Sequence, residues 1–129
     1  MILDYYGVNI RYRRLRQVLQ SSEDGTPFDN LLHLTALGVA VTVANEFKDP
    51  MALLDASLQR TVPVILAVGT AYLSYWTEDT DHAVVVAGAD AMSIALYDPW
   101  FPNAPQIVER VHVESAWLES AFKYGVIKK

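Results

Sequence analysis

Three apolar runs of strand length, separated by turn-rich segments, constrain the fold of this chain most strongly. They are TVPVILAV at 61–68, HAVVVAG at 82–88 and SIALYD at 93–98. Each run is nearly continuous in apolar residues, which is typical of strands covered on both faces rather than exposed to water on one. The short gap between the last two runs predicts an antiparallel hairpin, so we expect a packed sheet.

The first half of the chain is predicted to be mainly helical. A first helix is indicated by apolar residues at roughly helical spacing, namely Ile10, Leu15, Val18 and Leu19. The turn-rich segment 21–26 ends it, and a second helix is expected with Thr26 as N-cap, Pro27 at its first position and Gly38 just past its end. A short strand at 39–44 and a helix opened by Asp49 follow.

The last third of the chain predicts a loop, one helix and short strands. The proline-rich segment 99–106 reads as a loop, and 106–113 as a possible edge strand. A helix is expected at 114–122, and 126–127 could add a short strand. Helices first and a mostly antiparallel sheet afterwards predict an α+β fold.

Composition favours one globular domain over residues 1–129. The chain is 52 % hydrophobic and 19 % charged, which excludes a disordered tail. The formal net charge of −5 disfavours nucleic acid as a partner, and the basic residues of the first helix are spread around its circumference: Arg11, Arg13, Arg14 and Arg16. With neither a secretory signal nor an apolar run of membrane-spanning length, we expect a cytoplasmic protein.

His82 begins one predicted strand and Asp98 ends the next. Side chains alternate along a strand, so 82, 84 and 86 share one face, as do 94, 96 and 98. A three-residue loop at 89–91 would pair 86 with 94, 84 with 96 and 82 with 98. A two-residue loop would put Asp98 on the wrong face and separate the apolar sets, so we disfavour it.

A carboxylate that accepts the N–H of a histidine fixes the tautomer and raises the basicity of the other ring nitrogen. The pair could equally be a structural hydrogen bond that closes a hairpin end. His33 and His112 have no second ligand at metal spacing, so we expect no metal. We also find no serine-nucleophile elbow and no phosphate-binding glycine loop, and we expect no cofactor.

Several segments together resemble a known family. The segments ILDYYGVNIRYRRLRQVL, DGTPFDNLL, PVILAV, DHAVVVAG and YDPW are similar to papain-like cysteine peptidases of the bacteriocin-processing, double-glycine (C39-like) type. The resemblance implies a helical lobe packed on a mostly antiparallel sheet, hydrolysis of peptide bonds, His82 as general base and Asp98 as its orienter. In that family the nucleophilic cysteine lies in an Asp-Cys-Gly segment, with an oxyanion glutamine slightly upstream.

Neither of those two segments occurs here, and the chain has no cysteine. The resemblance places the cysteine about two helical turns before Met1, so we expect an N-terminally truncated domain that is inactive as written. A non-catalytic peptide-binding module is the alternative, and an unrelated α+β protein with a structural His-Asp pair is a third. Tyr75, Trp76 and Trp100 could shape a substrate groove.

Truncation has a physical consequence, because a missing helix would leave apolar surface bare. We expect that surface near Ile2, Leu3 and the face of His82, and therefore self-association of the chain.

Overall fold

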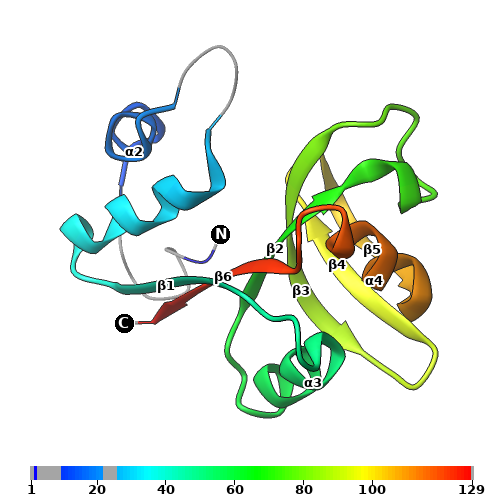
Figure 1. The fold of residues 1–129 in the computed structure, drawn as a ribbon. Coiled ribbons are helices and arrows are strands. Elements are labelled where there is room, and N and C mark those ends of the chain that lie inside the picture. Colours follow the sequence, from blue (N-terminus) through cyan, green and yellow to red (C-terminus); the bar gives the residue numbers. More distant parts are fainter. Residues whose placement is uncertain (1, 3–9, 22–25, 129) are drawn as a thin grey trace.

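The computed structural model describes residues 2, 10–21 and 26–128 of the chain. Six strands form one sheet in the order β1-β6-β2-β3-β4-β5, and every neighbouring pair is antiparallel. The predicted α+β class is confirmed (Figure 1). In chain order the elements are α2 (Tyr12–Leu19), η1 (Phe28–Leu37), β1 (Ala40–Asn45), α3 (Pro50–Gln59), β2 (Val64–Gly69), η2 (Thr70–Tyr72), β3 (Asp81–Ala89), β4 (Ser93–Asp98), β5 (Phe101–Glu109), α4 (Arg110–Leu118) and β6 (Lys123–Lys128).

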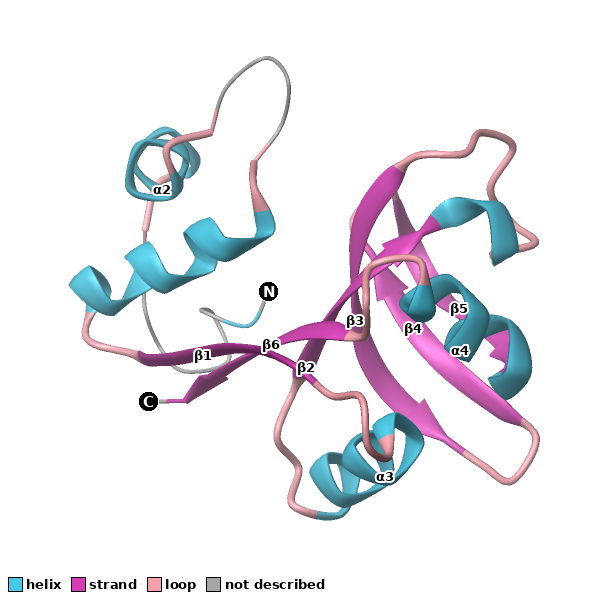
Figure 2. Cartoon of the chain, viewed as in Figure 1, coloured by secondary structure: helices cyan, strands magenta, loops and turns pink. Residues whose placement is uncertain are grey.

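The helices are divided between two lobes, seen apart in Figure 2. α3 and α4 pack on one face of the sheet over a core that includes Leu54, Leu66, Val84 and Trp117. α2 and η1 form the other lobe, above a second core of buried residues: Ile2, Leu34, Val39, Ile65 and Ile127. Every residue of β2 is buried because its alternate side chains enter both cores. This confirms the prediction that the continuous apolar run at 61–68 contains a strand covered on both faces.

The helix caps follow the sequence only in part. η1 is a 3₁₀ helix that begins after Pro27, and Thr26 does not cap it. The Thr26 hydroxyl instead hydrogen-bonds the hydroxyl of Ser21, so the N-cap prediction is wrong. Gly38 ends the helix as expected, at a φ of 84° that favours glycine. Asp49 caps α3 as expected, accepting a 3.2 Å hydrogen bond from the N–H of Ala52.

β5 and α4 replace the predicted loop and edge strand. Pro102 and Pro105 lie within β5, which is an edge strand and pairs with a neighbour on one side only, the position in a sheet where proline is tolerated. The strand ends at Glu109, and α4 takes up residues predicted as strand, including the exposed His112. The helix is favoured because three of its residues are buried at helical spacing: Val113, Ala116 and Trp117.

The short strand predicted at 126–127 is part of β6, and it runs between β1 and β2, a position that the sequence did not predict. Its Gly125 lies directly beneath η1: a Cβ at this position would come within 2.9 Å of Leu31 Cδ1 and 3.5 Å of Phe28 Cζ. Glycine therefore allows the helical lobe to approach the sheet closely here.

The register of the β3–β4 hairpin differs from the predicted one. Val86 pairs with Leu96 rather than with Ile94, and a bulge between Val86 and Gly88 shifts the register so that Ala89 pairs with Ile94. The bulge adds an unpaired residue to β3, which the sequence pattern alone does not reveal. Because the shift near the site is two residues, His82 and Asp98 still lie on the same face.

The region near the start of the chain corrects another expectation. Ile2 is only 8 % exposed and packs in the second core, so apolar surface is not bare at this residue. Leu3 and the YYG motif at 5–7 lie outside the described residues. Within the described ranges, no helix combines the length and apolar character needed to cross a membrane.

Candidate functional site

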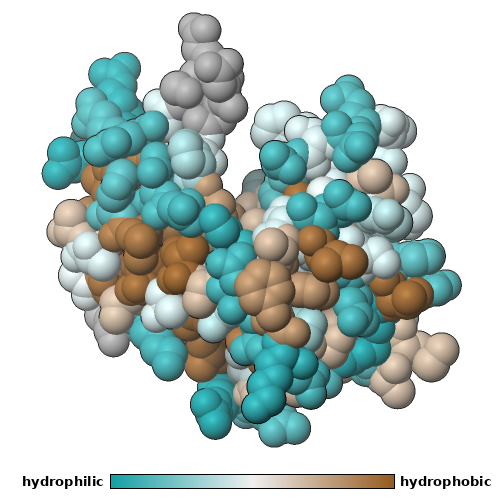
Figure 3. All heavy atoms as spheres, viewed as in Figure 1, coloured by the Kyte–Doolittle hydropathy of each residue, from teal (hydrophilic) through white to brown (hydrophobic). Residues whose placement is uncertain are grey.

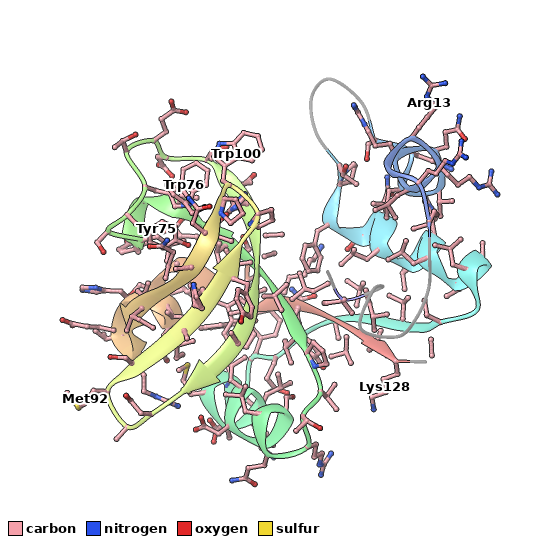
Figure 4. All side chains as sticks on the ribbon, turned by 180° about the vertical axis from the view of Figure 1, so that it is seen from behind. Arg13, Tyr75, Trp76, Met92, Trp100 and Lys128 are labelled. Carbon is pink, nitrogen blue, oxygen red and sulfur yellow. The ribbon has the colours of Figure 1, made fainter. Side chains whose placement is uncertain are left out.

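His82 and Asp98 lie at the end of the β3–β4 hairpin that is remote from its turn. β3 begins at Asp81 and β4 ends at Asp98, whereas the turn occupies 90–92. In Figure 4 the labelled Trp76 and Trp100 lie near the end of the hairpin that holds the pair, and Met92 lies at the turn. The pair therefore stands where β3 starts and β4 stops, beside the loops that follow β2 and β4.

The two side chains are in direct contact. His82 Nε2 is 2.7 Å from Asp98 Oδ1, and the exposed fractions of the two side chains are 16 % and 0 %. Because an ionised carboxylate can only accept, Nε2 carries the proton and donates it to Oδ1. Nδ1 is then the basic nitrogen of the neutral ring, and it has no hydrogen-bond partner among the described residues.

Asp98 accepts hydrogen bonds on both oxygens. Oδ1 also accepts from the backbone N–H of Trp100 at 2.9 Å, while Oδ2 accepts from Tyr75 Oη at 2.8 Å and from Trp76 Nε1 at 2.9 Å. Burial alone would raise the pKa of this carboxyl, but the hydrogen bonds from His82, Trp76, Trp100 and Tyr75 outweigh burial and hold the pKa below its usual value. The carboxylate thus stays ionised in a buried position.

Aromatic rings enclose the pair from one side. The Trp76 ring meets the His82 ring at a centroid distance of 4.8 Å, and both Trp76 and Tyr75 contact Phe101 edge-on at 5.5 and 5.0 Å. Phe101 was missed by sequence reasoning because it falls in the segment predicted to be a loop. Its only sequence signal is proximity to Asp98, with which it pairs across β4 and β5.

A cleft of about 1020 Å³ opens between the two lobes, and His82 lies on its border. The surface is visibly hollowed there (Figure 3). Leu15, Leu19 and Phe28 contribute an apolar wall from the helical lobe, and Ala67 and Ala83 contribute small side chains from the sheet. The charged side chains of the lining are Arg16, Asp81, Glu119 and Lys123.

The three aromatic residues predicted for a groove have different places. Trp100 lines the cleft and is 71 % exposed. Tyr75 and Trp76 are not among the cleft-lining residues: they lie behind Asp98 and hold its Oδ2. Of the three side chains, only that of Trp100 can touch a ligand in the cleft, whereas those of Tyr75 and Trp76 contact the carboxylate.

The remaining histidines lie away from the pair. His33 lies within η1, as the helical pattern predicted, and its buried Nδ1 has no hydrogen-bond partner in the part of the chain that the structure describes. Within the described ranges, no three His, Asp or Glu side chains come together in a way that could hold a metal ion. The chemistry available at the site is thus that of an oriented imidazole: it can take a proton on Nδ1 and return it, with Asp98 stabilising the imidazolium.

Comparisons with known proteins agree on one family and one fold. The sequence matches the model of the Peptidase C39 family over residues 1–122. The fold is similar to the crystal structure of a C39-like peptidase from Bacillus anthracis, with a TM-score of 0.72, 16 % identity, and coverage of 98 % of this chain and 84 % of that chain. It is also similar to the peptidase domain of Streptococcus ComA, described as a bi-functional ABC transporter involved in quorum sensing, with a TM-score of 0.73, 17 % identity and the same coverage. No curated protein matches the sequence.

Proposed function

Because this chain belongs to the Peptidase C39 family, we propose that it is a cysteine-peptidase-type domain in which His82 is the general base and Asp98 its orienter. The observation that carries the proposal is the 2.7 Å contact between His82 Nε2 and Asp98 Oδ1. This contact leaves Nδ1 as the basic nitrogen of a ring that borders the cleft. A carboxylate, an imidazole and an open position beside it are the arrangement that activates a nucleophile.

In the proposed reaction, Nδ1 takes the proton of a thiol and the thiolate attacks the carbonyl carbon of a peptide bond. The imidazolium then gives that proton to the leaving amine, and an acyl-thioester remains. A water molecule, deprotonated by the same nitrogen, attacks the thioester and releases the acid, and the proton returns to the thiolate. Asp98 stays ionised throughout and stabilises the imidazolium.

The 129-residue sequence contains no cysteine, so we propose that this chain by itself does not hydrolyse peptides. Loss of the nucleophile typically lowers the rate by about 10⁶-fold. The cleft is large enough for a helix that carries a cysteine, because a helix of about two turns occupies roughly 800–1,200 Å³, from its 1.5 Å rise and 10–12 Å diameter. The cleft measures about 1020 Å³ and presents small side chains at Ala67 and Ala83.

The test compares three proteins. The first is the 129-residue chain; the second is the same chain extended by a helical segment that carries a glutamine and an Asp-Cys-Gly sequence; the third has the added cysteine replaced by serine. We expect only the second to cleave a peptide that contains a Gly-Gly sequence, under reducing conditions. A well-folded second protein that cleaves no such peptide would contradict the proposal.

A non-catalytic peptide-binding module is the second candidate. It is favoured by the combination of an open cleft, an exposed Trp100 at its border and the absence of cysteine from the sequence. In this case the unmodified chain should bind the same peptide without cleaving it, as measured by calorimetry, and Trp100→Ala should weaken the binding. Tyr72→Ala is the matched control, because Tyr72 is also exposed but does not line the cleft.

A further inference from the structure

Two side chains behind Asp98 have no part in the proposed reaction, yet apart from His82 they are the described side chains that hydrogen-bond its carboxylate. Tyr75 Oη and Trp76 Nε1 both donate to Asp98 Oδ2, at 2.8 and 2.9 Å. We propose that Tyr75 and Trp76 are positioning residues, which hold the carboxylate so that its other oxygen faces His82 Nε2. The inference rests on the proposed function and identifies two residues that determine the state of its base.

The geometry explains why two donors on Oδ2 matter. A carboxylate can rotate about its Cβ–Cγ bond, and a single hydrogen bond from His82 would leave that rotation poorly fixed. Oδ1 is held by His82 and by the backbone N–H of Trp100 on one side, and Oδ2 is held by two different donors on the other. Four donors from three segments of the chain therefore define one orientation of the carboxylate.

The donors themselves are rigidly held. They lie in the segment between β2 and β3, which is closed by the buried Thr70: its hydroxyl donates to Glu78 O and accepts from the N–H of Thr80. Leu73 is buried within the same segment, and the N–H of Trp76 donates to its carbonyl at 3.0 Å. The Tyr75 and Trp76 rings also pack edge-on against Phe101.

The protonation of Tyr75 suits a permanent donor. Burial raises the pKa of its phenol, and the hydrogen bond to Asp98 and the charge of Asp98 raise it further. The hydroxyl therefore stays protonated at neutral pH. The charged groups that line the cleft beside His82 are Asp81 on β3, Arg16 on α2, Glu119 after α4 and Lys123 on β6.

The consequence for His82 is a choice of tautomer. While Oδ1 faces Nε2, the neutral ring carries its proton on Nε2 and keeps Nδ1 free for a thiol. If Asp98 can turn, the ring loses this preference and the proton distributes over both nitrogens. Tyr75 and Trp76 would thus act on the base through Asp98, without touching a substrate.

The experiment uses the 129-residue chain and needs no activity. Nitrogen-15 spectra of the imidazole rings, assigned with His82→Gln, report which ring nitrogen of His82 is protonated and how fast that proton exchanges with water. Tyr75→Phe and Trp76→Phe each remove one donor and keep an aromatic ring. Tyr97→Phe is the matched control: it removes a phenol hydroxyl next to Asp98, from an exposed side chain on the opposite face of β4.

We expect wild type and Tyr97→Phe to show a proton on Nε2 that exchanges slowly. Tyr75→Phe and Trp76→Phe should each accelerate that exchange by about tenfold, the effect of losing one hydrogen bond to a charged group. Spectra of both variants that match wild type, while Asp98→Asn changes them, would overturn the inference. If Trp76→Phe does not fold, Tyr75→Phe, which lacks a single oxygen atom, decides alone. The nitrogen-15 spectra need no thiol. This test therefore remains valid even if the extended chain fails to hydrolyse peptides.

Discussion

His82 and Asp98 are diagonal neighbours across the β3–β4 hairpin, not opposite ones, yet their side chains are 2.7 Å apart. Val86 pairs with Leu96 and Val85 with Tyr97, and continuing this register places Val84 opposite Asp98. Diagonal residues on one face remain within reach of long side chains. A histidine side chain is long enough to span this offset. His82 therefore contacts Asp98 although the two residues are not directly opposite each other.

Replacing Asp98 should cost stability. In Asp98→Asn an amide N–H₂ takes the place of one accepting oxygen, so at least one buried donor among Tyr75, Trp76 and His82 loses its acceptor. We expect the free energy of unfolding at pH 7 to fall by about 2–4 kcal/mol. Urea denaturation measures it, and Asp90→Asn, at an exposed turn, should cost less. An Asp98→Asn protein as stable as wild type would show that the carboxylate is not needed for the fold.

The lowered pKa of Asp98 also predicts how the free energy of unfolding changes at acidic pH. The pKa of Asp98 is lowered in the folded state, so its contribution is complete above the unfolded pKa of about 3.9 and is lost as pH falls through the lower folded value. The difference in unfolding free energy between wild type and Asp98→Asn should therefore be constant near neutral pH and shrink below about pH 4. Denaturation curves at a series of pH values test this, and a difference that grows in acid would contradict it.

The raised pKa of Tyr75 predicts that the free energy of unfolding falls at alkaline pH. Its pKa is raised in the folded state, mainly by burial, so its contribution is complete below the unfolded pKa of about 10 and is lost as pH rises further. Wild type should lose stability above about pH 10 more steeply than Tyr75→Phe. The phenolate absorbance of the two proteins should also differ, with one tyrosine of wild type ionising last or only on unfolding. An early-ionising Tyr75 would refute this account of its environment.

The approach of the two lobes can be tested at Gly125. Gly125→Ala would place a methyl group within 2.9 Å of Leu31 Cδ1, and we expect the free energy of unfolding to fall by about 1–3 kcal/mol as the side chains of Leu31 and Phe28 shift. Gly88→Ala is the matched control, because nothing lies within 4 Å of a Cβ there and the residue is in the same sheet. The control should leave the unfolding midpoint unchanged or raise it slightly. Equal losses in both variants would mean that close approach of η1 is not the cause.

The sequence predicted β2, β3 and β4 and the shared face of His82 and Asp98, because these features depend on local apolar pattern and on alternation along a strand. It could not reveal the bulge after Val86 or the pairing of Phe101 with Asp98, since these depend on contacts between segments far apart. The prolines of β5 suggested a loop, and only the edge position of the strand makes them tolerable. The roles of Tyr75 and Trp76 were invisible for the same reason: their spacing does not show that both face one carboxylate oxygen.

The most direct test of the central proposal is the rate of peptide cleavage by the chain extended with the cysteine-bearing segment, measured with histidine and with glutamine at position 82. Glutamine keeps the size and polarity of the side chain but cannot take a proton. If His82 is the general base, His82→Gln should lower kcat by about 10²–10⁴-fold while the protein stays folded. A folded His82→Gln protein that cleaves the peptide as fast as its parent would contradict the account.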